Sequence, residues 1–274
     1  MKDSNLSLLL FAAGLGTRLR PFTDLNPKPC ISMLSIPMGY YLFPYFNHLH
    51  FVNKVANTFH LPNQIHHLYS KHDFLFSNEV NFIKGSGGGL QQAQNLLSQN
   101  HSHDYSILTC NADEIFFTEN TNFLIDAYNT HSTQDNFATL IVTQHPEAGH
   151  KFGAIWTEGK KVVSIGKQKP TPNSQPWHFI GLQFLKSQIF NYLKHDIEQN
   201  IFYDVLVEHL IDHKVEIYPI ECDWYETGNL LDYRDARIQI KNILNDASHP
   251  KHNIYKSHYL HLNQFKNSEL CDLT

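Results

Sequence analysis

A run of apolar residues that enters a glycine-containing loop limits the fold of this chain more than any other feature. Residues 8–18 read Leu-Leu-Leu-Phe-Ala-Ala-Gly-Leu-Gly-Thr-Arg. At the end of a buried strand, small residues let backbone N–H groups approach a phosphate group closely, and Arg18 and Lys28 add positive charge. The segment therefore predicts a polyphosphate site at the end of a buried strand.

Two common phosphate-binding loops do not fit these residues. A dinucleotide-binding fingerprint needs a third glycine where Leu19 stands, and a Walker loop needs a Gly-Lys-Ser/Thr sequence that residues 14–20 lack. An ordinary tight turn between a strand and a helix is the remaining alternative. We therefore expect a phosphate loop of another class.

The spacing of apolar residues alternates along the rest of the chain between two kinds of segment. Short apolar runs predict strands at residues 8–11, 54–59, 106–109, 137–143, 179–185 and 215–220. Helical spacing predicts helices at residues 38–49, 88–97, 121–131, 204–213 and 229–244. The runs 154–157 and 162–165 flank a turn-like Glu-Gly-Lys sequence and predict a hairpin. Together these patterns predict a Rossmann-like α/β fold, with a mostly parallel central sheet flanked by helices and a small β-hairpin insertion.

Composition and charge exclude several classes of protein. The 274 residues are 42% hydrophobic, which suits one large core, and the formal charge is −5 without the long basic block that nucleic-acid binding requires. The apolar run at residues 8–13 is too short for a membrane helix. We expect a cytoplasmic protein with no nucleic-acid or membrane partner. Its main domain is expected at residues 1–245, followed by a peripheral extension at 246–274.

Neither the cysteines nor the histidines form a metal-binding motif. Four widely spaced cysteines predict free thiols: Cys30, Cys110, Cys222 and Cys271. His66, His67 and His72 crowd one stretch, but no second cluster completes a site. We expect these histidines to be solvated surface residues.

The opening segment, together with Asn26-Pro27-Lys28-Pro29, resembles the signature of the sugar-1-phosphate nucleotidyltransferases. That signature reads Ala-Ala-Gly-x-Gly-Thr-Arg-Leu-x-Pro-x-Thr and then Pro-Lys-Pro, and its enzymes couple a nucleoside triphosphate to a sugar 1-phosphate and release pyrophosphate. The resemblance implies that Arg18 holds the β- and γ-phosphates and that Lys28 stabilises charge around the α-phosphate. It also implies nucleotide contacts from Ala12, Ala13, Gly14, Gly16 and Thr17.

A second glycine segment, Gly85-Ser86-Gly87-Gly88-Gly89-Leu90, is similar to the loop that faces the nucleobase in this family. The resemblance implies that Gly87 and Gly88 bind the nucleotide, and the run of three glycines favours a uridylyl group. A flexible turn before a helix is the alternative explanation.

Two carboxylates are candidate magnesium ligands. The apolar run that begins at Ile107 ends in Asp113, where the family carries Gly-Gly-Asp, and an aspartate at the carboxyl end of a parallel strand points into the crevice where ligands bind. Glu226 follows Trp224 where the family carries Trp-x-Asp, and Asp223 is the alternative ligand. The resemblance therefore implies Mg²⁺ as the cofactor, held by Asp113 and Glu226.

The acceptor side departs most from the family. Gln168-Lys169-Pro170 stands where the family has Glu-Lys-Pro, which implies that Lys169 meets the sugar phosphate. Gln168 keeps hydrogen bonding to the sugar but loses the charge of the usual glutamate. Gly181 resembles a glycine that lines the sugar pocket, or else it allows close strand packing.

The expected activity is transfer of a nucleoside monophosphate, from UTP by preference, to a sugar 1-phosphate. In size the chain is similar to N-acetylmuramate-1-phosphate uridylyltransferases and short mannose- or heptose-phosphate guanylyltransferases. The sequence is compatible with a homo-oligomer. One alternative is a guanylyl- or cytidylyltransferase that uses another phosphate acceptor, such as choline phosphate. Another is a catalytically weak nucleotide-sugar-binding protein, suggested by Ala112, Gln168 and Glu226.

Overall fold

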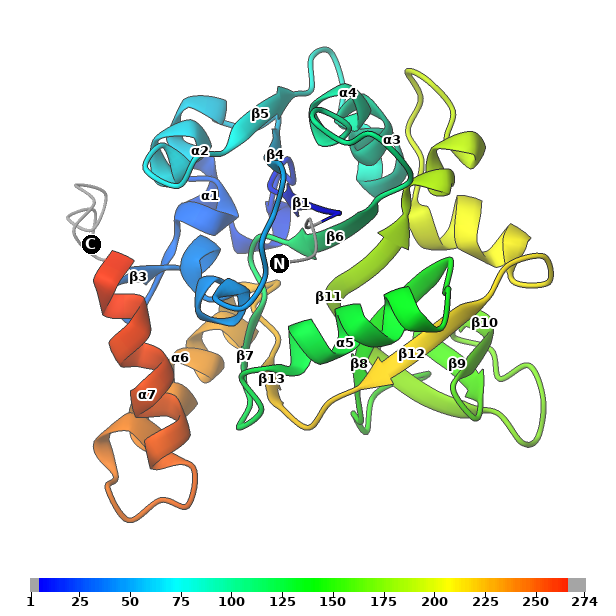
Figure 1. Cartoon of the computed structure of the whole chain (residues 1–274). Coiled ribbons are helices and arrows are strands. Elements are labelled where there is room, and N and C mark those ends of the chain that lie inside the picture. The colour runs from blue at the N-terminus through cyan, green and yellow to red at the C-terminus, as the bar shows by residue number, and fades with distance from the viewer. Residues whose placement is uncertain (1–4, 266–274) are drawn as a thin grey trace.

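A nine-stranded sheet organises residues 5–265, the part of the chain that the computed structural model describes (Figure 1). Its strand order is β5-β4-β1-β6-β11-β8-β12-β10-β9. The strands are β1 (Leu6–Phe11), β4 (Lys54–Thr58), β5 (Leu75–Asn78), β6 (Ser106–Asn111), β8 (Ala138–Thr143), β9 (Ala154–Glu158), β10 (Lys161–Gly166), β11 (Gln175–Lys186) and β12 (Val215–Pro219). Two small two-stranded sheets join β2 (Ser32–Met33) to β3 (Ile36–Pro37) and β7 (Ile115–Phe117) to β13 (Asp223–Tyr225).

The central strands are parallel and are covered on both faces. β5, β4, β1 and β6 run parallel to one another, and so do β8 and β12. Along β1, Leu8 and Leu10 pack into one core while Leu9 packs into the other, because successive side chains of a strand point to opposite faces. A strand buried on both faces is continuously apolar, which explains the opening run of leucines.

The sheet is mixed, whereas the sequence predicted a mostly parallel one. β11 runs antiparallel to β6, β8 and β9, and the predicted hairpin forms as the antiparallel pair β9–β10. The chain enters β11 directly from the loop that follows this hairpin, without a crossover helix to reverse its direction. An apolar run reveals a strand, but it does not reveal the direction of that strand.

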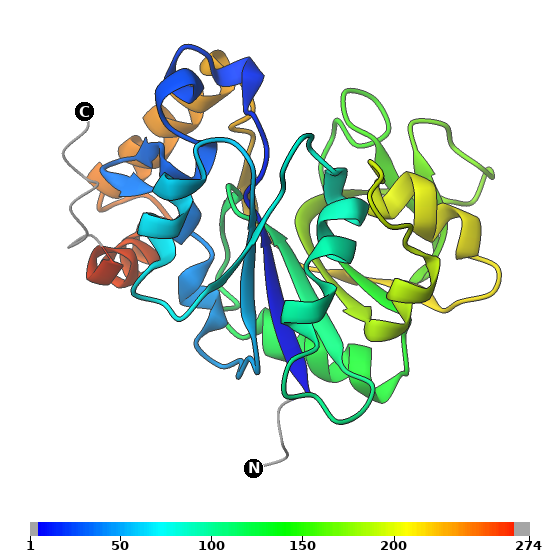
Figure 2. The same ribbon diagram turned by 90° about the horizontal axis from the view of Figure 1, so that it is seen from above.

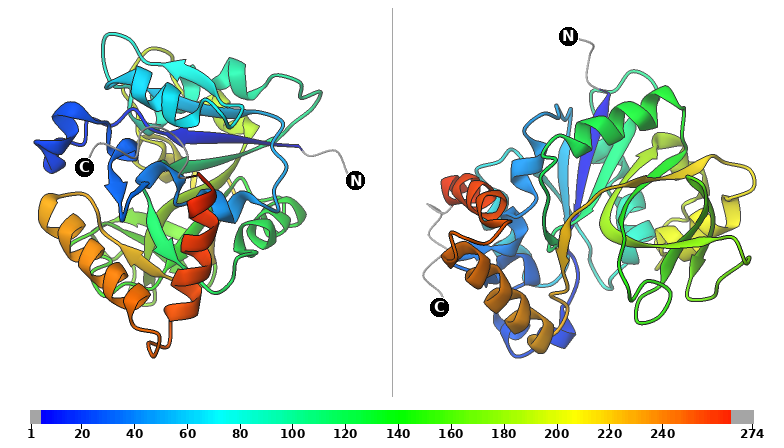
Figure 3. Two further views of the ribbon diagram at one scale, coloured as in Figure 1. Left: turned by 90° about the vertical axis from the view of Figure 1, so that its left-hand side faces the viewer. Right: turned by 90° about the horizontal axis from the view of Figure 1, so that it is seen from below.

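The strands after β6 close into a ring. β11 pairs with β8 and, at its start, with β9, so that the ladder returns on itself through β8, β12, β10 and β9. The register between β11 and β8 shifts between Phe179 and Gln183, and Gly181 in this interval has φ +81°. This irregularity bends β11 and lets it serve both parts of the sheet. The right-hand view of Figure 3 shows the green and yellow strands curving round.

Helices cover the two faces of the sheet. They are α1 (Phe22–Leu25), α2 (Pro62–Tyr69), α3 (Gly85–Gln92), α4 (Gln94–Leu97), α5 (Phe123–Thr133), α6 (Leu230–Asn245) and α7 (His252–Leu262). The first core contains residues of α2, α5, α6 and α7, and the second contains residues of α3 and α4. None of the helices between residues 5 and 265 is long and apolar enough to span a membrane.

Two of the predicted helices do not form as regular α-helices. Residues 38–49 fold into 3₁₀ turns, and this segment contains Gly39 and Pro44, which both disfavour an α-helix. Residues 201–206 form one π-helical segment and 207–209 one 3₁₀ turn, in place of the helix expected at 204–213. Each of the six predicted strands is present.

Helix α7 lies within residues 246–274, the segment expected as a peripheral extension, and packs into the first core. Tyr255, His258 and Leu262 are buried, and His258 Nε2 lies 3.1 Å from the carbonyl oxygen of Tyr41. The buried residues of this helix recur at spacings of three and four and form one face. The many polar residues between them make this face hard to recognise in the sequence. Residues 266–274, and with them Cys271, lie outside the described part; Cys30, Cys110 and Cys222 are free thiols, as expected.

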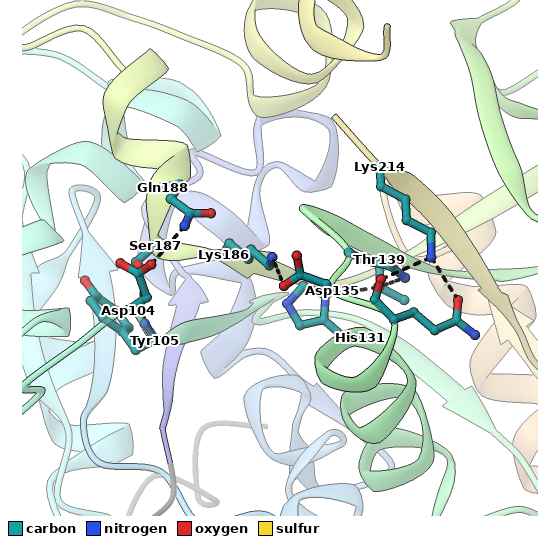
Figure 4. A network of polar contacts seen from close by, with 11 residues as sticks. Asp104, Tyr105, His131, Asp135, Thr139, Lys186, Ser187, Gln188 and Lys214 are labelled. Carbon is teal, nitrogen blue, oxygen red and sulfur yellow. Dashed lines mark hydrogen bonds and ion pairs between the residues drawn. The ribbon is translucent and has the colours of Figure 1, made fainter. Parts of the chain in front are cut away.

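A polar network fastens the end of the sheet at which the parallel strands begin (Figure 4). His131 Nδ1 at the end of α5 lies 3.0 Å from Thr139 Oγ1 on β8, and Lys186 at the end of β11 pairs with Asp135. Gln188 Nε2 donates to Asp104 Oδ2 at 2.9 Å. The candidate site lies at the opposite end of the sheet, where the parallel strands finish.

Candidate active site

A cavity of about 430 Å³ lies where β1, β4 and β6 end. This is the edge at which open α/β sheets bind ligands. Figure 2 shows α1 and α6 on one side of β1 and the green and yellow strands on the other. The lining combines the loop after β1 with residues from six other segments: Phe11, Ala12, Ala13, Gly14, Gly16, Thr17, Arg18, Lys28, Pro29, Asn57, Glu79, Ile83, Gly85, Ser86, Asn111, Asp113 and Gly228.

Specific contacts fix the backbone conformation of the loop after β1. Gly16 has φ +59°, and a Cβ there would lie 2.8 Å from Thr23 Cγ2. Thr23 Oγ1 donates to the Gly16 carbonyl at 2.9 Å, and Ala12 N donates to Asn57 Oδ1 at 2.8 Å. A Cβ at Gly14 would meet no atom within 4 Å. The structure therefore brings the five predicted nucleotide contacts of this loop to the cavity.

A buried carboxylate that sequence reasoning missed positions Asn57, the residue that accepts a hydrogen bond from this loop. Glu79 follows β5 and accepts hydrogen bonds from Asn57 Nδ2 and from Lys84 N, both at 2.7 Å. Burial raises the pKa of Glu79 despite these two donors. Its position directly after a parallel strand is the signal that could have identified it.

The second glycine segment begins α3, and only its first residues reach the cavity. Gly85 and Ser86 line it, whereas Gly87 and Gly88 are buried against the segment 197–199. Gly87 N donates to the Gln199 carbonyl at 2.8 Å, and a Cβ on Gly88 would overlap the Ile197 carbonyl. The structure does not bring Gly87 and Gly88 together with the loop after β1.

A lysine–aspartate pair stands at the end of β6. Lys28 Nζ lies 2.6 Å from Asp113 Oδ2, with both side chains largely buried. Burial lowers the pKa of Lys28, but Asp113, Glu114 and Glu226 raise it by more, so its pKa is raised. Lys28 is therefore a fixed positive charge at the cavity wall.

Glu114 is a second residue of this centre that sequence reasoning undervalued. Its carboxylate accepts hydrogen bonds from Asn111 Nδ2 at 2.8 Å and from Trp224 Nε1 at 2.9 Å. Burial, and then the charge of Asp113, raise the pKa of Glu114 to about 7. A Cβ on Gly181 would overlap this carboxylate, so the glycine makes room for Glu114.

Arg18 and Glu226 both lie close to Gly228, in the turn before α6. Gly228 N donates to Glu226 Oε1 at 2.6 Å, and a Cβ on Gly228 would lie 2.9 Å from an Arg18 nitrogen. The charge of Glu226 also acts on Lys28.

The carboxylates suit a metal ion that takes part of its coordination from substrate. In the described part of the chain, no three His, Cys, Asp or Glu side chains come together as a metal-binding group. Magnesium commonly binds one or two carboxylates and completes its shell with phosphate and water oxygens. Asp113 lines the cavity, whereas Glu226 does not, although its neighbour Gly228 does. Asp223 accepts from the hydroxyl of Tyr255 at 2.8 Å and pairs with Lys251, so it fastens α7.

The predicted sugar-phosphate residues are not all close to this centre. Gln168 and Lys169 are exposed on the loop after β10, and neither lines the cavity. Gly181 lies beside Glu114, as described above.

The chain belongs to the nucleotidyl transferase family, whose sequence profile matches residues 7–243. It is 24% identical over 249 residues to the UTP–glucose-1-phosphate uridylyltransferase of Synechocystis sp., covering 84% of this chain and 62% of that protein. Identity to the glucose-1-phosphate adenylyltransferase of Fervidobacterium nodosum is 22% over 267 residues, covering 86% of this chain and 61% of that protein. The chain thus spans about three fifths of the length of these relatives.

The same fold is present in solved structures of low sequence identity. The structure of a UDP-glucose pyrophosphorylase complexed with UDP-glucose superposes with a TM-score of 0.70 at 17% identity, over 86% of this chain and 99% of that one.

Proposed function

We propose that this protein transfers a nucleoside monophosphate, from UTP by preference, to a sugar 1-phosphate and releases pyrophosphate. The observation that carries the proposal is the Lys28–Asp113 pair, which stands at one cavity with the loop 12–18. The names of the two curated relatives, which both specify glucose 1-phosphate, support a sugar phosphate as the acceptor. Those names differ in the nucleotide; the name of the first relative, a UTP–glucose-1-phosphate uridylyltransferase, supports UTP.

In the proposed reaction, a phosphate oxygen of the sugar 1-phosphate attacks the α-phosphorus, and the bond from the α-phosphorus to the pyrophosphate oxygen breaks. The attacking phosphate is already ionised, so no side chain has to remove a proton. The protein needs to position two anions and to neutralise the charge that develops between them.

The chain supplies two cations for this task. Lys28, fixed by Asp113, stabilises charge on the α-phosphate, and Arg18 beside Gly228 holds the β- and γ-phosphates. In a cavity with little water, each charge acts more strongly than it would in solution. The amides of residues 13–17 provide further donors for the phosphates.

Asp113 and Glu226 are the residues that would hold Mg²⁺. When bound, the ion neutralises phosphate charge without taking up or releasing a proton. We further propose that Lys169, an exposed cation on the loop after β10, contacts the acceptor phosphate and that Gln168 bonds to a sugar hydroxyl.

A pyrophosphate-release assay tests the proposal. Each of the four nucleoside triphosphates is combined with a panel of sugar 1-phosphates and Mg²⁺, and the wild type should release pyrophosphate with at least one pair. Lys28→Ala and Arg18→Ala should each lower kcat/KM by about 100-fold or more. Lys214→Ala is the matched control, because Lys214 contacts Gln134 at the opposite end of the sheet. Equal rates in all three variants would contradict the proposal, and triphosphate binding without turnover would point to a nucleotide-binding protein.

A further inference from the structure

Four aromatic rings form a cluster beside the Lys28–Asp113 pair. The ring centroid of His178, on β11, lies 4.1 Å from that of Trp224, 5.0 Å from that of Phe152 and 5.2 Å from that of His145. Trp224 meets His145 and Phe152 edge to face. We call these residues the aromatic cluster.

His178 has a hydrogen-bonding capacity that the described part of the chain does not use. Only 6% of the residue is exposed, and neither Nδ1 nor Nε2 has a hydrogen-bond partner. Burial, followed by the charge of His145, lowers the pKa of His178 to about 4, so the ring is neutral at pH 7. Unpartnered buried polar atoms are rare in folded proteins and need an explanation.

The aromatic cluster is joined to the reacting centre by direct contacts. Trp224 Nε1 donates to Glu114, which is adjacent to Asp113, and Gly181 on the same strand as His178 packs against Glu114. None of the four rings lines the cavity that contains the loop after β1. The aromatic cluster therefore borders Glu114, outside the cavity that contains the loop after β1.

One wall of the aromatic cluster is formed by a loop. His178 and Trp224 are on strands, whereas His145 and Phe152 belong to the irregular segment 144–153 between β8 and β9. This segment also contacts α6 through Lys151, whose Nζ lies 3.6 Å from Asp232 Oδ2 and 5.2 Å from the Phe152 ring centroid. Because His178 is buried, a ligand can reach its ring only if a surrounding segment moves, and 144–153 is the one without regular secondary structure among those that carry the four rings.

We propose that His178 determines acceptor specificity: when the segment 144–153 opens, its two ring nitrogens exchange hydrogen bonds with hydroxyl groups of a sugar phosphate. A neutral imidazole has one donor and one acceptor, which matches a hydroxyl group. Trp224 and Phe152 offer apolar faces to the C–H groups of the sugar ring. A quaternary ammonium acceptor such as choline phosphate would leave both nitrogens unpaired. This inference rests on the proposed function.

The experiment compares His178→Phe with the wild type for acceptor kinetics and thermal unfolding. His178→Phe keeps a ring but removes both nitrogens, so it should lower kcat/KM for the sugar 1-phosphate by about tenfold or more while the KM for the nucleotide is unchanged. Its Tm should stay the same or rise, because no hydrogen bond within the chain is lost. His178→Asn should restore part of the acceptor affinity.

His131→Phe is the matched control. His131 is equally buried, and its Nε2 is also unpartnered, but it lies at the opposite end of the sheet and should leave the acceptor KM unchanged. If the wild type uses a sugar 1-phosphate and His178→Phe shows the wild-type KM for it, the inference is overturned and the proposed function stands. If the wild type refuses every sugar 1-phosphate, the proposed function fails.

Discussion

Gly181 and Glu114 fit each other so closely that a single methyl group on the glycine would overlap the carboxylate. Gly181 is on β11 and Glu114 lies between β6 and β7, where its carboxylate accepts hydrogen bonds from Asn111 and Trp224. Glycine at position 181 thus leaves the space that the Glu114 carboxylate occupies.

Gly181→Ala should displace Glu114 and lower the free energy of unfolding. Gly159→Ala is the control, because Gly159 also has a positive φ, but a Cβ there would meet no atom within 4 Å. Both variants strain the backbone, and only Gly181→Ala adds the clash, so it should cost about 1–3 kcal/mol more in urea unfolding. Equal losses in the two variants would show that the contact with Glu114 is of no consequence.

Asp113, and not Asp223, should control the dependence on magnesium. We expect Asp113→Asn and Glu226→Ala to lower Mg²⁺-dependent pyrophosphate release by about 100-fold, and Glu226→Asp to remain active because it restores the usual carboxylate. Asp223→Asn should retain its magnesium titration curve while losing stability, because Asp223 bonds to Tyr255 and Lys251. A lost magnesium dependence in Asp223→Asn alone would move the metal ligand to that residue.

His131 should make the fold sensitive to acid. Burial lowers the pKa of His131 to about 4, against 6.5 for a free histidine. As the pH falls below about 6.5, the unfolded chain takes up the proton first. The contribution of neutral His131 to the free energy of unfolding is therefore fully present above pH 6.5 and is lost between pH 6.5 and 4. His131→Phe should therefore lose less stability than the wild type over this interval, by up to about 3 kcal/mol. Chemical unfolding at several pH values measures the difference, and the exposed His150→Gln should behave like the wild type.

Tyr255→Phe tests whether α7 stabilises the core. The Tyr255 hydroxyl donates to Asp223 Oδ2 at 2.8 Å and lies 2.7 Å from the Tyr225 hydroxyl. Removing it should cost about 1–2 kcal/mol of unfolding free energy and leave the nucleotide KM unchanged. Tyr203→Phe, at an exposed position, is the comparison. Equal stability of the two variants would mean that the hydroxyl of Tyr255 contributes nothing.

Local patterns in the sequence predicted the elements that depend on local physics. The run Leu6–Phe11 is a strand because its side chains are apolar on both faces, and the loop that follows it lies at a cavity, as its small residues indicated. The direction of β11 could not be predicted, because it depends on pairing with β6 and β8, which are distant in sequence.

The candidate site could be predicted only where its residues share a short segment. Arg18, Lys28 and Asp113 each belong to a motif in its own short segment, and all three lie at the cavity. No local pattern distinguishes Gly85 from Gly87, because helical rotation decides which glycine faces inward. Glu79 and His178 were missed for another reason. Their burial and their partners arise from the packing of strands that are distant in sequence.

The pairing of β11 with β9 also limits how copies of this protein could associate. Within residues 5–265, β9 pairs with both β10 and β11, so the end of the strand order that has no further partner is the four residues of β5. A short edge strand is a poor template for the addition of a foreign strand. Addition of a strand from another copy at β5 is therefore a disfavoured route to association.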